Sequence, residues 1–181
     1  PAQSYYAVKT YEDGDKVNIT AAAEGMKAVS SATVVPSRFP LTSINFVLKG
    51  GEPNQLQFWI HFTDNAQTKD YYALKVERKR QFWNDSKYSV ENSSLTLNLD
   101  DEPLLNTSSG LDDILMIENE FYRNLYYWDD TKIQGKSYKV RLNTNYEADY
   151  EDDFITPDGV EHIKCQVKYR ISLYSLSEEF Y

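Results

Sequence analysis

The chain has 181 residues, enough to bury roughly 70% of its unfolded surface on folding. Its 28 acidic and 19 basic side chains give a formal net charge of −9 at pH 7, which argues against recognition of nucleic-acid phosphates and of anionic membrane surfaces. The single cysteine excludes an internal disulfide and a multi-cysteine zinc site, and the 15 tyrosines favour strands over helices.

Residues 1–40 differ in character from the rest of the chain. The segment "SYYAVKTYEDGDKVNITAAAEGMKAVSSATVVPSRFP" is typical of the closing strands of a small β-sandwich, and Pro36 and Pro40 then indicate a linker. We therefore predict two domains, with the closing strands and linker in residues 1–40 and a second β-rich domain in residues 41–181.

Apolar and polar residues alternate along most of the second domain, which is the pattern of strands with one buried face. We expect a mainly β fold, an antiparallel β-sandwich or barrel-like sheets with little helix. The best helix candidates are Gly110–Glu120 and the final segment "SLSEEFY". The predicted strands cover residues 44–50, 56–63, 70–79, 94–101, 136–143 and 160–176.

The acidic segment "NTNYEADYEDDFITPD", residues 143–158, connects two of these strands. Tyr146, Tyr150 and Phe154 recur every four residues, so we expect a short amphipathic turn with aromatic anchors and solvated acids. A calcium site is the minority interpretation. It uses Asp149, Glu151 and Asp153, whose alternate spacing is like the start of a calcium-binding loop; Phe154 and Val160 stand where an EF-hand needs glycine and glutamate, so that motif is excluded.

The residues that could support catalysis are few. Cys165 and His162 share a predicted strand, but an offset of three places them on opposite faces. Cys165 alternates with apolar residues, which predicts a small buried side chain rather than a nucleophile. Acidic residues mostly flank predicted turns, where solvated carboxylates are expected, so a glycoside hydrolase is the least favoured function. We expect a protein that is not an enzyme and needs no cofactor.

Surface aromatic residues are the better candidates for a site, because Trp and Tyr faces stack on sugars and peptides while polar neighbours form hydrogen bonds. Alternation places Trp59 and His61 on the water-facing side of their strand. Tyr126, Tyr127 and Trp128 precede Asp129-Asp130 in a predicted loop. These five residues form our predicted ligand-binding set; in the alternative, Trp59 faces a second layer of the protein.

Three separated segments have a familiar order and spacing: "YEDGDKVNITAAAEGMKAVSSATVVP", "FWIHFTDNAQTKDYYALKVE", and "YYWDDTKIQGKSYKVRLN" with the closing "VKYRISLYSLSEEFY". Together they resemble the Bacteroidota cell-envelope lipoprotein family known as domain of unknown function 4249. The resemblance covers nearly the whole chain. It implies that residues 1–40 close an immunoglobulin-like β region, and that the anchoring cysteine lies upstream of Pro1 and a short piece follows Tyr181.

The resemblance also implies a cellular setting, an outer-membrane lipoprotein encoded near nutrient-uptake receptors. We therefore expect a non-catalytic binding accessory whose partner is a TonB-dependent receptor, a glycan or a peptide. It would touch the membrane only through a lipid anchor outside this chain. A structural or adhesion component of the cell surface is the alternative.

Overall fold

A computed structural model describes residues 9–51, 54–84, 87–105, 124–157 and 159–181. Strands dominate these ranges, and the prediction of a mainly β fold is confirmed. No helix within them is long and apolar enough to cross a membrane. The strands are β1 (Lys16–Ala21), β2 (Val29–Val34), β3 (Leu41–Leu48), β4 (Gln55–Thr63), β5 (Tyr71–Asn84), β6 (Lys87–Ser94), β7 (Tyr126–Asp129), β8 (Ser137–Asn145), β9 (Tyr150–Thr156) and β10 (Gly159–Leu176), with one 3₁₀ turn, η1 (Asp130–Lys132).

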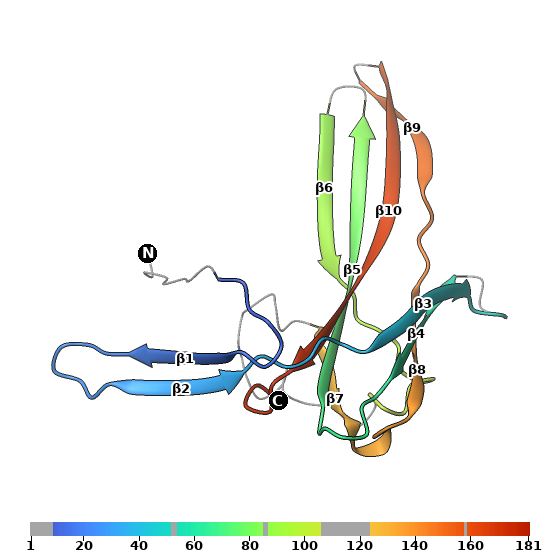
Figure 1. The fold of residues 1–181 in the computed structure, drawn as a ribbon. Coiled ribbons are helices and arrows are strands. Elements are labelled where there is room, and N and C mark those ends of the chain that lie inside the picture. Colours follow the sequence, from blue (N-terminus) through green and yellow to red (C-terminus); the bar gives the residue numbers. More distant parts are fainter. Residues whose placement is uncertain (1–8, 52–53, 85–86, 106–123, 158) are drawn as a thin grey trace.

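The strands form three antiparallel sheets, none of which closes on itself in the described part of the chain. The hairpin β1-β2 is a sheet by itself. A three-stranded sheet has the order β3-β4-β8, and a larger sheet has the order β6-β5-β10-β9, with β7 also paired to β5. Figure 1 shows the larger sheet rising as a tall ribbon from the region where it meets the smaller one.

The core lies between the three-stranded sheet and the lower half of the larger sheet. Alternate residues of β4 point into it, and Phe58, Ile60 and Phe62 are at most 4% exposed. The facing residues on β5 include Tyr72 and Leu74, which are equally buried. The rings of Phe62 and Tyr72 meet edge to face with centroids 5.6 Å apart, a geometry that aromatic pairs prefer.

Strands β5 and β10 extend well beyond this core. Their register runs without interruption from Tyr71 opposite Leu176 to Asn84 opposite Ile163. From Tyr72 to Val76 every residue of β5 is buried, whereas beyond Val76 the residues are half-buried or exposed. We call the extension the arm: residues 77–84 of β5, residues 159–170 of β10, and strands β6 and β9 (Figure 1).

Several expectations about individual elements are wrong. Residues 94–101 do not form the predicted strand: β6 ends at Ser94, and Asn98 then forms an isolated bridge with Asn143. The end of the chain forms a turn in which the backbone N–H of Phe180 donates to Ser177, rather than a helix. The amphipathic turn expected around Tyr150 is instead the start of strand β9. The helix predicted at residues 110–120 lies outside the described residues.

The apolar side of β3 is in the expected register but more exposed than expected. Phe46 lies opposite Phe58 of β4 and therefore on the core side of its sheet. It is nevertheless 70% exposed, and Leu48 is 56% exposed. The reason is position: β3 is the edge strand, with β4 on only one side of it.

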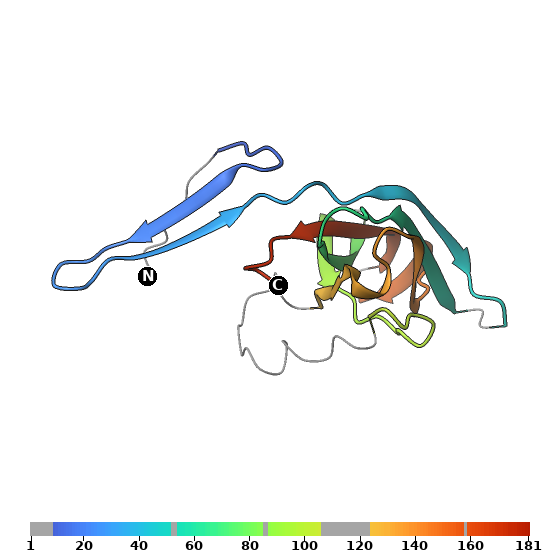
Figure 2. The same cartoon turned by 60° about the horizontal axis from the view of Figure 1, so that its bottom comes forward.

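The β1-β2 hairpin extends away from the two packed sheets, as Figure 2 shows from a second direction. The Thr33 hydroxyl donates to the Glu179 carboxylate over 2.8 Å, which links β2 to the chain end. Ile19 and Val29 are each 66% exposed. The division of the chain at residue 40 stays a prediction.

Gly135 provides a test of the turn before β8. Its φ of +68° is unfavourable for other L-residues, and an added Cβ would lie 2.7 Å from the Cβ of Ala66. We expect Gly135→Ala to lower the free energy of unfolding by at least about 1–2 kcal/mol in urea denaturation. Gly50→Ala is the control, because nothing lies within 4 Å of its added Cβ. Equal stability of the two variants would contradict this description of the turn.

Candidate functional site

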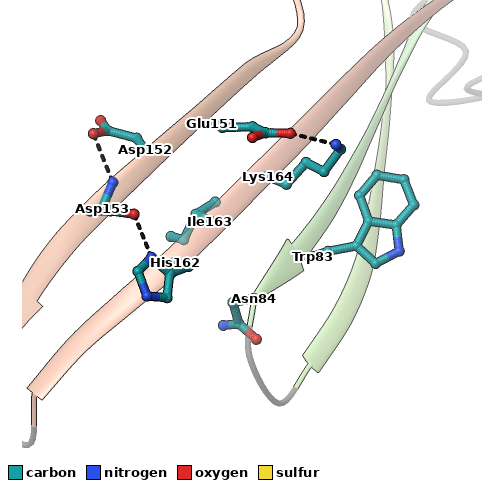
Figure 3. Close-up of a pocket in the computed structure, with 8 residues that line it drawn as sticks. All are labelled: Trp83, Asn84, Glu151, Asp152, Asp153, His162, Ile163 and Lys164. Carbon is teal, nitrogen blue, oxygen red and sulfur yellow. Dashed lines mark hydrogen bonds and ion pairs between the residues drawn. The ribbon is translucent and has the colours of Figure 1, made fainter.

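An open hollow of about 710 Å³ lies near the tip of the arm. Trp83 and Asn84 of β5, three consecutive acids of β9, and residues 162–164 of β10 line it (Figure 3). Strand register explains the gathering, because Lys164 pairs with Trp83 on one side and with Glu151 on the other. Residues directly opposite each other share a sheet face. Trp83, Lys164 and Glu151 therefore form one row across three strands.

The row continues onto β6 as an exposed aromatic pair. Tyr88 lies directly opposite Trp83, and their ring centroids are 5.3 Å apart. Trp83 is 36% exposed and Tyr88 is 51% exposed. The side-chain amide of Gln81 donates to the Tyr88 hydroxyl over 2.7 Å, which fixes the ring. An aromatic surface that is both exposed and held in place is suited to stacking against a ligand.

Sequence reasoning missed this pair, although a signal for it was present. The predicted strand ended at residue 79, but the alternation continues through "RQFWN", with Phe82 on one face and Trp83 on the other. The turn-forming sequence Asn84-Asp85-Ser86 then precedes another aromatic residue. Extending the strand to the turn would have placed Trp83 near the tip of a hairpin.

Charged side chains occupy the other end of the row. Lys164 pairs with Glu151, and this contact raises the pKa of Lys164. In the next row, the Nδ1 atom of His162 contacts the carboxylate of Asp153. Asp152 is a third acid in the lining, so acids outnumber the two basic residues Lys164 and His162. The hollow thus combines an aromatic face with hydrogen-bond acceptors and carries net negative charge.

Two of the three predicted calcium ligands, Glu151 and Asp153, lie on β9, and Asp149 directly precedes this strand. An extended backbone separates Glu151 from Asp153 by roughly 7 Å. The two carboxylates contact Lys164 and His162, whereas the Asp149 carboxylate accepts a hydrogen bond from the Val167 N–H over 2.7 Å. Within the described residues, these three acids do not form a group that converges on one point. The structure does not bring the three predicted residues together, because each carboxylate contacts a different partner.

Trp59 and His61 lie on the side of β4 that faces away from the core, as alternation predicts. Both are half-buried. The Trp59 ring has the Nζ atom of Lys139 4.5 Å from its centroid, and its Nε1 donates to the side chain of Gln57 over 2.5 Å. These contacts occupy part of the indole. A ligand-binding role for Trp59 and His61 stays a prediction, on a different sheet from the arm hollow.

The prediction of a surface loop at Tyr126, Tyr127 and Trp128 is wrong. These residues form β7, which pairs with the lower end of β5. Trp128 is 3% exposed because this pairing directs its ring into the core beside Tyr72. The Tyr126 hydroxyl accepts a hydrogen bond from the backbone of Leu97, and Tyr127 packs against Tyr181. The Trp128 ring is therefore too buried to stack against a ligand.

Comparison with known proteins adds a family assignment. The model of the family described as "Domain of unknown function (DUF4249)" matches residues 1–181, the whole chain. The chain belongs to the DUF4249 family. No curated protein matches it. No solved structure matches it either.

One group of acids in this DUF4249 chain does have the geometry to hold a metal ion. Oxygen atoms of Asp64, Asp70 and Asp130 all lie within 4.8 Å of one another, and carboxylate oxygens are the ligands that hard cations prefer. Donors from the protein already engage the two buried acids. Tyr72 and the Gly135 N–H donate to Asp64, while the Asp70 N–H and Lys69 donate to Asp130. These hydrogen bonds join the loop after β4 to η1.

Lys69 is the charge that balances this acidic group. Burial alone would lower the pKa of Lys69, but hydrogen bonds to Asp130 and Asp129 outweigh burial and raise it. The ammonium lies 2.5 Å from Asp130 and 3.3 Å from Asp129. Lys69 therefore offsets part of the negative charge of this group.

Cys165 is buried on the apolar side of β10, as predicted. Burial raises the pKa of its thiol, although a hydrogen bond with Tyr150 acts in the opposite direction. A thiol with a raised pKa is less often present as the reactive thiolate. This geometry agrees with a packing role in the DUF4249 fold.

The carboxylate of Glu147 binds two arginines at the base of the arm, and we call these contacts the Glu147 clasp. Glu147, in the link between β8 and β9, reaches Nη1 of Arg78 at 2.6 Å and Nε of Arg80 at 2.7 Å, both on β5. Its backbone N–H donates to the hydroxyl of Tyr169 on β10. The hydrogen bonds from Arg80, followed by the charge of Arg78, outweigh burial and lower the pKa of Glu147.

Replacing this carboxylate should make stability less dependent on pH. Because the folded-state pKa of Glu147 is lowered, its contribution is present above the ordinary value of 4.5 and is lost as pH falls through the folded value. We expect Glu147→Gln to destabilise the protein by about 1 kcal/mol at pH 7 and to have a smaller effect at pH 3, measured by urea denaturation. Glu151→Gln, at an exposed pair, is the control and should change little. A Glu147→Gln effect that is equal at both pH values would contradict the clasp.

Proposed function

We propose that this DUF4249 chain is a non-catalytic binding module, and that the arm is its binding element. The observation that carries the proposal is the row Tyr88-Trp83-Lys164-Glu151, which presents an exposed aromatic pair and a charged pair on one sheet face. The row lies outside the hydrophobic core, where exposed aromatics are not needed for folding. Aromatic residues with polar neighbours are typical of recognition surfaces.

The ligand that suits this surface is an extended glycan or peptide. Trp83 and Tyr88 offer ring faces for a sugar ring or an apolar side chain. Glu151 and Asp153, which share the sheet face of Lys164, can accept hydrogen bonds from hydroxyl or amine groups. The hollow is open rather than enclosed, which favours a chain that passes across it over a small molecule that must be surrounded.

We place the module in the cell envelope, as part of an outer-membrane lipoprotein of Bacteroidota that assists a nutrient-uptake receptor. Membership of the DUF4249 family and the resemblance to its lipoproteins support this setting. The net charge of −9 disfavours direct adhesion to an anionic membrane surface, and a lipid anchor is the membrane attachment that the resemblance to this family suggests. A TonB-dependent receptor is the partner that this setting suggests.

Two observations favour binding over chemistry. The thiol of Cys165 is 1% exposed, so a substrate does not reach it. The acids of the arm hollow contact cations or backbone groups and are spread along a strand, whereas a glycosidase pair needs one raised carboxyl pKa at a defined separation. The alternative of a structural or adhesion component would use the same strands for assembly.

A glycan and peptide array tests the proposal with purified protein. We expect binding by the unaltered chain and at least about tenfold weaker binding by Trp83→Ala, because central aromatic contacts often contribute more than 1 kcal/mol. Tyr146→Ala is the aromatic control, since Tyr146 is 42% exposed and does not line the hollow. Trp59→Ala tests the sequence-predicted face separately. Binding that survives Trp83→Ala and is lost in Trp59→Ala would move the site to the three-stranded sheet.

A further inference from the structure

A second hollow, which we call the inter-sheet pocket, lies where the two packed sheets diverge. Its walls come from Gln55 at the start of β4, residues 143–145 at the end of β8, Arg78 at the base of the arm, and residues 95–98. Figure 1 shows β4 and β8 leaning away from β5 and β10 above the core. The pocket measures about 350 Å³, at the low end of the range of roughly 300–1,000 Å³ for small-molecule sites.

The pocket has one stiff wall. The backbone N–H of Asn98 donates to Asn143 over 2.9 Å, and the N–H of Asn143 donates back to Asn98 over 3.2 Å. The Asn143 side chain also bonds Gln57 and Asp101, so its position is fixed on both sides. A wall that is held before any ligand arrives loses little entropy on binding.

The lining offers hydrogen bonds but little net charge. Gln55 and Asn145 carry amides, Thr96 and Thr144 carry hydroxyls, and the floor includes Leu97. Among the lining residues that the structure describes, Arg78 alone is charged, and the carboxylate of Glu147 lies 2.6 Å from it. Such a lining favours an uncharged polar ligand, because a free charge would find no opposite charge to offset its loss of water.

Two polar atoms of the lining residues have no protein partner in the described part of the chain. They are the Oε1 acceptor of Gln55 and the Nε donor of Arg78, and both are buried. Buried polar atoms are nearly always hydrogen-bonded, to protein, to water or to a ligand. A molecule that carries both donor and acceptor groups can serve both atoms, with a small movement of either side chain. Hydroxyl groups have this dual capacity.

We propose that the inter-sheet pocket binds a small uncharged molecule rich in hydroxyl groups, with a single neutral sugar ring as the class that fits. Its size and its lining of amides and hydroxyls carry the inference. The site is separate from the arm hollow, which lies near the other end of the arm strands. It therefore does not depend on the function proposed for Trp83 and Tyr88.

Nuclear magnetic resonance titration of ¹⁵N-labelled chain tests this proposal. The probes are glucose, galactose, mannose and N-acetylglucosamine, with glucuronate and glucosamine as charged comparisons. We expect at least one neutral sugar to cause saturable shifts in the backbone amides of Asn98, Thr144 and Asn145, and the charged sugars to cause weaker ones. No saturable shift of these amides by any neutral sugar would overturn the proposal and would leave ordered water as the partner of the buried atoms.

Matched variants separate binding from folding. Thr144→Val removes one hydroxyl with little change of shape, and Asn145→Leu removes an exposed amide. Each should weaken sugar binding about tenfold, the effect of losing one or two hydrogen bonds. Thr42→Val, on β3 and outside the pocket, should bind normally. Unchanged affinity in both pocket variants would overturn the proposal, as would shifts confined to Trp83, which would support the arm hollow alone.

Discussion

The uninterrupted pairing of β5 with β10 is the interaction on which the rest of the structure depends. One register joins Tyr71 to Leu176 in the core and Asn84 to Ile163 in the arm. In the core half, packing against β4 and β8 stabilises the pair. In the arm half, the pair is stabilised by cross-strand contacts with β6 and β9 and by the contacts of Glu147 with the arginines of β5. The fold can therefore extend a sheet far beyond its core without a second layer over its whole length.

Both hollows follow from this division. The arm hollow exists because β5 and β10 leave the core together and β9 pairs with β10 in the arm, so that Trp83, Lys164 and Glu151 lie in one row. The inter-sheet pocket exists because the smaller sheet does not follow, so that Arg78 and the end of β8 face a space that is not filled by apolar side chains. Along β5, the row proposed to bind a ligand and the residues of the hydrophobic core thus lie at opposite ends of the same strand.

Sequence periodicity predicted most of the strands that carry an apolar stripe, and it failed at β6, which has none, and at β7, whose burial depends on a distant strand. The apolar stripe from Leu56 to Phe62 identified β4, and that of the final segment identified β10. Strand β6, "KYSVENSS", lacks an apolar stripe because most of its residues face water on both sides of the sheet. Trp128 was misplaced because its burial comes from pairing with β5, which is distant in sequence. The spacing of the acids around β9 suggested a metal site, but the three carboxylates contact different partners instead of converging.

Amide hydrogen exchange along β5 tests the division between core and arm most directly. Residues 72–74 and residues 81–83 both lie between two hydrogen-bonded neighbours, so their backbone pairing is equivalent. The two segments differ in burial: residues 72–74 lie in the core half of β5, whereas residues 81–83 lie in the arm. The account predicts that amides of residues 81–83 exchange at least about 100-fold faster than those of residues 72–74, because the arm opens without unfolding the core. Equal protection of the two segments would contradict it.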